Sequence, residues 1–226
     1  MKEYLGGAVS AAAAERLEQF WRFLVEKNKV MNLTAITDDE AGANLHFLDS
    51  LSILRAADLK GKTLVDVGTG AGFPGMPLAI AEDVHVTLLD SQQKRIEFLR
   101  EACALVGVEA ELIHARSEEL GLSKKYRESF DFATSRAVAR LDMLCELCLP
   151  LVKVGGAFIA MKGSGAAEEL ADAQKAIAKL GGQVREVIPY TVAGGGERSL
   201  IVIEKAEKTP AGYPRRFSKI KSSPIK

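Results

Sequence analysis

The sequence predicts an α/β protein built on a seven-stranded, mostly parallel, doubly wound sheet. From Lys62 onward, β-branched apolar runs alternate with amphipathic helical segments, which is the pattern of strands joined by crossover helices. The last two apolar runs are separated only by the short segment 191–197, and a parallel crossover needs more residues than that. We therefore expect the final strand to run antiparallel to its neighbours.

Residues 1–58 precede this alternation and predict an N-terminal helical cap. Ser10 is suited to cap a helix. The apolar residues of that helix fall on one face, namely Leu17, Phe20, Trp21, Leu24 and Val25. Further helices are expected from Asp38 or Asp39 and over the segment 46–55.

Residues 59–207 predict the sheet domain, and residues 208–226 form a basic tail. We expect strands at residues 62–67, 84–89, 109–114, 130–135, 155–161, 183–190 and 198–204. We expect helices at residues 75–81, 91–106, 117–121, 140–152 and 166–180.

The most informative segment is the glycine turn Asp66-Val-Gly-Thr-Gly-Ala-Gly-Phe-Pro-Gly75. It follows a buried strand, and Pro74 lies where a helix can begin, because its fixed φ suits the first helical turn. A strand, a glycine turn and a helix N-terminus together form a geometry that holds nucleotide-like ligands. The glycines allow a sharp turn and let a ligand approach the backbone closely.

Two registers of these glycines compete. One fits the dinucleotide fingerprint G-x-G-x-x-G, at 70–75. The other, in which Asp66 precedes Gly68, Gly70 and Gly72, is that of S-adenosylmethionine (SAM)-dependent methyltransferases. Asp66 favours SAM, since a carboxylate there would lie near a methionine ammonium and has no task beside a pyrophosphate. A nicotinamide-dependent oxidoreductase remains the alternative.

The ligand of a doubly wound sheet lies beyond the carboxyl ends of the strands. Asp90 ends the second strand, where either ligand would offer it a ribose. Ser117 and Glu118 follow the third strand and are expected at the adenine edge. Phe73 is expected on the methionine side of the pocket, and Ser135-Arg136 follows the fourth strand.

Other features exclude several classes of protein. The sequence has no apolar run long enough to span a bilayer and no signal-peptide pattern, which predicts a cytoplasmic protein. Cys145 and Cys148 lie within an amphipathic helical pattern and are expected in the core rather than in a redox motif. The three histidines lack the spacing of metal ligands, so we expect no metal site.

The basic tail predicts contact with nucleic acid. The whole chain has a formal net charge of zero, but residues 208–226 contain six basic and no acidic residues. On a nucleotide-modifying enzyme this distribution favours RNA phosphate contact. The tail residues expected to bind RNA are Arg215, Arg216, Lys219 and Lys221, and Tyr213 and Phe217 are candidates for stacking.

The segment after the fourth strand, Thr134-Ser-Arg-Ala-Val138, limits the chemistry. It lacks the Asn/Asp-Pro-Pro-aromatic motif common in exocyclic amine methylation and the Pro-Cys of C5-pyrimidine methylation. A ring nitrogen such as guanine N7 has a free lone pair at neutral pH, so its methylation needs no base. Catalysis then reduces to positioning and electrostatics.

These features closely resemble the ribosomal RNA small subunit methyltransferase G family, also called glucose-inhibited division protein B. The resemblance spans nearly the whole chain and rests on these segments: Asn32-Leu-Thr-Ala-Ile-Thr, His46-Phe-Leu-Asp-Ser-Leu, Gly72-Phe-Pro-Gly-Met-Pro-Leu, Leu89-Asp-Ser-x-x-Lys-Arg, Ser135-Arg-Ala, Met161-Lys-Gly and Tyr213-Pro-Arg-Arg. It implies a class I SAM-dependent methyltransferase (Rossmann-like) fold. It also implies methylation of N7 of a guanine in the decoding-region loop of 16S rRNA, on the rRNA or the small subunit.

The resemblance also implies roles for particular residues. Gly68, Phe73, Ser117, Glu118 and Arg136 would bind the cofactor, and Arg136 is in addition a candidate for guiding the guanine. Lys162 and Arg198 end late strands and are expected to face RNA. Ser222-Ser223 departs from the family, whose tail often has more lysine. A non-catalytic RNA-binding factor stays open as an alternative, and a monomer is the default state.

Overall fold

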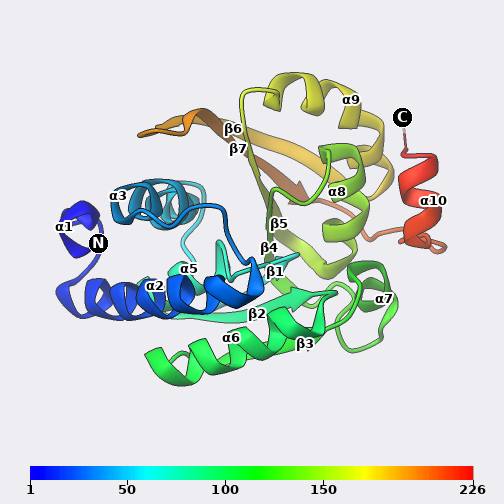
Figure 1. Cartoon of the computed structure of the whole chain (residues 1–226). Helices are drawn as coiled ribbons and strands as arrows, with labels where there is room; N and C mark the ends of the chain where they lie inside the picture. Colours follow the sequence, from blue (N-terminus) through cyan, green and yellow to red (C-terminus); the bar gives the residue numbers. More distant parts are fainter. Residues whose placement is uncertain (226) are drawn as a thin grey trace.

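The structure is a computed structural model that describes residues 1–225 and places one mixed sheet between two layers of helices (Figure 1). The strand order is β3-β2-β1-β4-β5-β7-β6, and β7 runs antiparallel to both of its neighbours. The strands are β1 (Lys62–Val67), β2 (Val84–Asp90), β3 (Ala110–His114), β4 (Phe130–Arg136), β5 (Val152–Lys162), β6 (Gly182–Val192) and β7 (Gly196–Lys205). The prediction of seven strands with one reversed is confirmed.

The helices follow the predicted order. They are α1 (Lys2–Leu5), α2 (Ala11–Met31), α3 (Asp39–Gly42), α4 (Asp49–Leu51), α5 (Gly75–Ala81), α6 (Gln93–Val106), α7 (Ser117–Leu122), α8 (Leu141–Cys148), α9 (Ala166–Lys179) and α10 (Phe217–Ser222). Ser10 caps α2 as expected, because its side chain accepts a hydrogen bond from Ala13 N at 3.2 Å. No helix among residues 1–225 combines the length and the apolar character needed to cross a membrane.

Each face of the sheet is covered by its own set of helices (Figure 1). The N-terminal helices, α5 and α6 pack on one face around Phe20, Trp21, Phe47 and Phe98. Helices α7, α8, α9 and α10 cover the other face. Successive residues of β1 serve the two cores in turn, since Leu64 belongs to the first and Val65 to the second. Residues 1–58 thus share the core of the sheet.

Two segments differ from the predicted elements. The helix expected over residues 140–152 ends at Cys148 and continues as a 3₁₀ turn, Leu149–Leu151, in which Pro150 cannot donate a backbone hydrogen bond. The helix expected over 46–55 is instead a π-helical turn, Ala43–Leu48, followed by α4 and a 3₁₀ turn, Ser52–Arg55. Such π turns are rare and are often found at functional sites.

The basic tail is folded onto the body of the protein. Helix α10 packs against α8, and its Ile220 is fully buried. Lys226, which belongs to the predicted tail, lies outside the described residues.

Candidate functional site

The glycine turn lies at the carboxyl end of β1, next to the point where the strand order switches from β1 to β4. Gly68, Gly70 and Gly72 have φ values of +73°, +61° and +97°, a region that side chains disfavour. The turn is tied to β2 because Gly68 N and Thr69 N both donate to Leu89 O, at 2.9 and 3.1 Å. A Cβ at Gly70 would meet only the Gly68 carbonyl oxygen, at 4.0 Å, so the backbone of the turn is open there.

Asp66 is buried directly beneath this turn. Its Oδ2 accepts hydrogen bonds from Thr69 Oγ1 at 2.7 Å and from Gly75 N at 2.8 Å. Its Oδ1 is buried and has no hydrogen-bond partner among the described residues. Burial raises the pKa of this carboxyl from 3.8 to about 6. A buried acceptor without a partner is costly, which suits a site that a cationic group completes.

Asp90 closes the other side of the turn. Its Oδ2 accepts from Gly70 N at 3.0 Å and from Arg95 Nη1 at 3.2 Å, and its Oδ1 accepts from Gln92 N at 2.8 Å. The carboxylate is almost fully buried at the end of β2. It is thus held rigidly beside the turn, as the sequence predicted from its position at the strand end.

Gly75 begins α5 and packs tightly against the sheet. A Cβ there would lie 2.3 Å from Leu88 Cδ2 and 2.9 Å from Asp66 Oδ2. Helix and strand therefore approach closely at the third glycine of the dinucleotide pattern, even though Pro74 precedes it. Pro74 is the N-cap residue, and the helix begins at Gly75 as expected.

A cavity of about 150 Å³ opens beside the turn. Its lining includes four residues predicted to bind the cofactor, namely Gly68, Asp90, Ser117 and Glu118. It also includes Arg116, Val138, Leu147 and Phe217, which sequence reasoning missed as pocket residues. Ser117 is fixed because its Oγ donates to Leu147 O at 2.5 Å.

Val138 narrows this cavity. Its Cγ2 lies 2.5 Å from where a Cβ at Gly68 would be, so the two residues are in close contact. Val138 follows Ala137, whose φ of +57° is unusual for a residue with a side chain. Most small-molecule sites enclose about 300–1,000 Å³.

Phe73 and Arg136 do not line this cavity and lie instead against the N-terminal helical cap. The ring of Phe73 stacks on His46 with centroids 4.4 Å apart, and the guanidinium of Arg136 lies 5.2 Å from the Phe73 centroid. Phe73 is 5% exposed. The structure thus places Phe73 in the core of the cap.

Asp49 joins this cluster to the sheet. Arg136 Nη1 donates to Asp49 Oδ2 at 2.7 Å, and Tyr190 Oη donates to Oδ1 at 2.9 Å. Arg136 Nη2 also donates to His46 Nδ1 at 3.2 Å, and His46 Nε2 lies 2.8 Å from Thr34 Oγ1. Asp49 was missed as a site residue. The sequence did offer an indication of its role. Three segments that carry the family resemblance, Asn32-Leu-Thr, His46-Phe-Leu-Asp and Ser135-Arg-Ala, all contribute residues to this cluster.

Burial and the neighbouring Arg136 lower the pKa of His46 to about 3. His46 is therefore neutral at physiological pH. It is also a weak base, because the charged form would have to face the guanidinium of Arg136 in a partly buried site.

The two strand-end cations expected to face RNA are paired with acids. Lys162 is 8% exposed, forms an ion pair with Glu169 at 2.7 Å and donates to Ala139 O at 2.7 Å. The structure therefore holds Lys162 inside the protein. Arg198 lies 3.6 Å from Asp49 and is about a quarter exposed.

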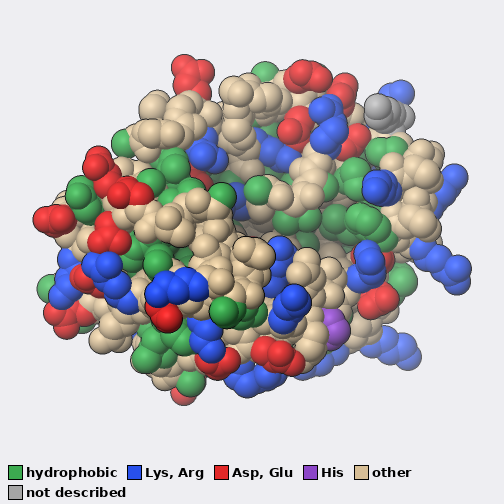
Figure 2. Space-filling view, in the orientation of Figure 1, with side chains coloured by type: hydrophobic (Ala, Val, Ile, Leu, Met, Phe, Trp, Pro, Cys, Tyr) green, Lys and Arg blue, Asp and Glu red, His purple; other side chains and the backbone are tan. Residues whose placement is uncertain are grey.

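The tail residues divide into two groups. Arg215 forms a nearly buried bidentate pair with Glu146, through Nε at 2.9 Å and Nη2 at 2.6 Å. Arg216, Lys219 and Lys221 are exposed. Figure 2 shows Lys and Arg side chains projecting along the right edge of this face, where α7 and α10 lie in Figure 1.

The residues of the turn fit a SAM molecule. The open backbone at Gly70 allows close approach, the unpartnered Asp66 Oδ1 is an acceptor for an ammonium, and Asp90 is positioned for a ribose. Ser117 and Glu118 are placed together at the far end of the cavity. These residues therefore match SAM in the charge of their side chains and in their positions around the turn.

Solved structures share this fold. The M. jannaschii protein TYW2, in complex with AdoMet, matches with a TM-score of 0.58 at 15% identity, covering 76% of this chain and 79% of that chain. A SAM-dependent methyltransferase from Aquifex aeolicus matches with a TM-score of 0.54 at 19% identity, covering 74% of this chain and 94% of the other. At these identities the likeness concerns the fold.

Sequence comparisons identify the family. The family model described as rRNA small subunit methyltransferase G matches residues 13–201. Proteins called ribosomal RNA small subunit methyltransferase G are 48% identical in Alkaliphilus oremlandii, over 96% of this chain and 93% of the relative. The protein of that name in Leuconostoc mesenteroides is 44% identical, over 97% of this chain and 94% of the relative. The chain therefore belongs to the ribosomal RNA small subunit methyltransferase G family, whose members use SAM as methyl donor.

Proposed function

We propose that this protein transfers a methyl group from SAM to N7 of one guanine in 16S rRNA, acting as a monomer in the cytoplasm. The observation that carries the proposal is the pairing of an open glycine turn with a buried carboxylate whose Oδ1 has no partner among residues 1–225. Membership of the methyltransferase G family supports the choice of ribosomal RNA as substrate.

The bound donor supplies an electrophilic methyl group on a sulfonium centre. The protein's part is to fix that donor and to bring a base to it in line. Asp66 would hold the ammonium, Asp90 the ribose hydroxyls, and Ser117 with Glu118 the adenine edge. The hydrogen bonds that Asp90 accepts from Gly70, Gln92 and Arg95 would fix the carboxylate that holds the ribose relative to the glycine turn.

The side chains near the turn suit a reaction without a general base. His46 has its pKa lowered to about 3 and donates and accepts within the protein, so it is a poor proton acceptor. The guanidinium of Arg136 is anchored to Asp49. It would orient a guanine through the carbonyl oxygen O6, which a guanidinium binds well, and leave N7 free to attack the methyl group.

The exposed cations of the tail would bind the RNA backbone. Arg216, Lys219 and Lys221 project from α10, on the same side of the molecule as the cavity lined by Phe217. Arg215 and Lys162 are already paired with Glu146 and Glu169, so they would contribute less. Arg198 is partly exposed beside Asp49 and is the strand-end cation best placed to meet RNA.

The test is to incubate the purified protein with labelled SAM and small subunits that lack the modification. Reduction followed by aniline treatment cleaves an RNA strand at N7-methylated guanine. We expect one methyl group per 16S rRNA and cleavage at a single guanine. Label that is incorporated without cleavage would assign methylation to another atom, and binding of NADH in place of SAM would overturn the proposal.

A further inference from the structure

We propose that Phe217, the first residue of α10, forms the outer wall of the cofactor cavity and stacks on the adenine of SAM. The inference rests on the proposed function, because it assumes that this cavity holds the donor. It gives the C-terminal segment a role in cofactor binding, in addition to contact with RNA.

Phe217 lies on the cavity that carries the adenine-side residues. It lines the same space as Ser117, Glu118 and Asp90, although more than ninety residues separate it from each of them in the sequence. The ring is half-buried, so one part of it remains free for a ligand. The cavity lining also includes the apolar side chains of Val138 and Leu147, which suit the flat face of a purine.

Arg116 holds the ring in this place. Its guanidinium lies 5.2 Å from the centroid of Phe217, a cation–π contact. Arg116 also lines the cavity and directly precedes Ser117. The ring is therefore tied to the segment after β3, which is the part of the fold expected to meet the adenine edge.

The tail that carries Phe217 is attached firmly to the body of the protein. Two residues before Phe217, the backbone N of Arg215 donates to Glu146 Oε1 at 2.7 Å, and its guanidinium binds the same carboxylate. Glu146 is 1% exposed. Three residues after Phe217, the side chain of Ile220 on α10 is fully buried. Phe217 is thus fixed from both sides.

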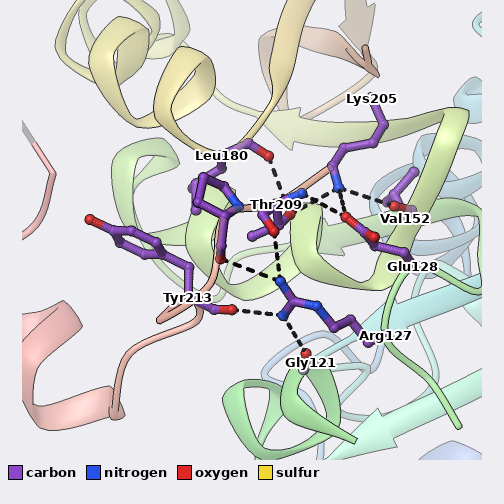
Figure 3. Close-up of polar contacts among 9 residues, drawn as sticks. Gly121, Arg127, Glu128, Val152, Leu180, Lys205, Thr209 and Tyr213 are labelled. Atoms are coloured by element: carbon purple, nitrogen blue, oxygen red, sulfur yellow. Dashed lines mark hydrogen bonds and ion pairs between the residues drawn. The ribbon is translucent and has the colours of Figure 1, made fainter. Parts of the chain in front are cut away.

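A second attachment fixes the tail further upstream (Figure 3). Arg127 donates to the backbone oxygens of Gly121, Thr209 and Tyr213 at 3.0, 2.8 and 2.7 Å. These contacts join α7 to the tail and satisfy carbonyl groups outside the regular elements. Helix α7 contains Ser117 and Glu118, so Arg127 links the adenine side of the cavity to the segment that delivers Phe217.

Glu128 and Lys205 reinforce this attachment (Figure 3). Lys205 is fully buried and its Nζ donates to Glu128 Oε1 at 2.8 Å and to Thr209 Oγ1 at 2.9 Å. Glu128 Oε1 also accepts from Thr209 N at 2.6 Å. A frayed tail would remove Thr209 from this lysine and leave it with Glu128 and the Val152 carbonyl as partners, a loss that is costly at a buried charge. The path of the chain from β7 to α10 is therefore well determined.

The test compares Phe217→Ala, Phe217→Tyr and Ser218→Ala by calorimetric titration with S-adenosylhomocysteine. Stacking of a base on an aromatic ring is worth about 5- to 150-fold in affinity when the ring is removed. We expect a loss in that range for Phe217→Ala, recovery for Phe217→Tyr and no change for Ser218→Ala, whose side chain is exposed.

A second ligand locates the effect. Titration with 5′-methylthioadenosine, which has the adenine but lacks the amino acid part, should show the same fold-loss in Phe217→Ala. An equal affinity of Phe217→Ala and the native protein for both ligands would overturn the inference. A loss for S-adenosylhomocysteine alone would also overturn it, because the ring would then act on the methionine end.

A third variant tests whether the attachment of the tail to the body of the protein is needed for cofactor binding. Arg127→Met removes the hydrogen bonds to the tail without touching the cavity, and it should weaken binding of both ligands as the tail loosens. Unchanged binding together with rapid proteolytic loss of the tail would contradict the role of Phe217. If the native protein binds neither ligand, the proposed function fails instead, so the two failures are distinct.

Discussion

At the residue scale, Asp66 shows how one buried carboxylate connects stability to cofactor binding. Burial raises its pKa to about 6, above the ordinary value of 3.8. Between about pH 4 and pH 6 the folded protein therefore keeps a proton that the unfolded chain has lost. The stability due to this proton is fully present below about pH 4 and is lost as the pH rises through 6.

Binding of a cationic ammonium should reverse this preference, because it stabilises the ionised carboxylate. We expect the affinity for S-adenosylhomocysteine to increase as the pH rises from 5 to 7, by up to about tenfold per pH unit below the pKa. Asp66→Asn should bind more weakly and without this pH dependence, as measured by calorimetry across that range. The control is Asp83→Asn, whose side chain is exposed. A native pH profile in Asp66→Asn would show that another group takes up the proton.

The sequence predicted those residues that sit at fixed offsets from a strand end. Asp66, Gly68 and Asp90 follow from the phase of two strands and the turn between them, and the structure places them around one turn. Val138 and Asp49 could not be predicted in this way. Their positions depend on contacts with Gly68 and Arg136, which are distant in the sequence.

At the element scale, the Asp49 carboxylate joins the cap to two strands of the sheet. Asp49 is 1% exposed and receives hydrogen bonds from Arg136 at the end of β4 and from Tyr190 on β6. Burial, together with the Asp49 carboxylate, raises the pKa of Tyr190 well above its usual range, so the phenol stays protonated and donates. Losing Asp49 leaves the largely buried Arg136 guanidinium without its counter-ion and removes the acceptor of the Tyr190 phenol.

We therefore expect Asp49→Ala to lower the free energy of unfolding by about 3–5 kcal/mol, the usual result of removing one partner from a buried ion pair. Urea unfolding monitored through Trp21, which packs in the same cap, provides the measurement. Glu40→Ala, an exposed acid on α3, is the matched control and should change stability by less than about 0.5 kcal/mol. Equal stability of the two variants would show that solvent replaces the carboxylate.

Regular elements were easier to predict than this junction. The strands of the sheet and the helices α5, α6, α7 and α9 follow from local apolar periodicity and from glycine or capping residues. The π-helical turn Ala43–Leu48 has no such local signal. It results from packing Phe47 and His46 against Phe73, a contact between separate elements.

At the scale of the whole molecule, charge is distributed so that only part of the tail is available to a polyanion. The net charge is zero, yet exposed lysines and arginines gather around α10. Arg215 and Lys205 are occupied within the protein. The composition of the tail predicted basic character correctly, but it could not separate cations that hold the fold from those that face solvent.

The exposed group gives a quantitative prediction for RNA binding. Replacing Lys219 and Lys221 together by alanine should reduce the slope of log affinity against log salt by about 0.7 for each phosphate contact to single-stranded RNA. Filter binding of a 16S rRNA fragment over a salt series measures the slope. Lys60→Ala, at an exposed lysine just before the amino end of β1, should leave the slope unchanged. If the double variant keeps the native slope, α10 does not touch the RNA backbone.

Deletion of the tail would be a poor substitute for these point variants. It removes Arg215, Ile220 and the partners of Arg127 together with the exposed lysines. Loss of RNA affinity and loss of structure would then be mixed in one measurement.

The position of Phe217 also has a practical consequence for labelling RNA. Because this part of the cavity wall comes from a segment outside the sheet, its size can be altered while the glycine turn and Asp90 remain intact. A shortened side chain there would leave space for a bulky substituent on the purine amino group of a synthetic donor. Such a donor would be refused by unmodified methyltransferases in a cell extract, so an engineered copy could mark its own substrate selectively.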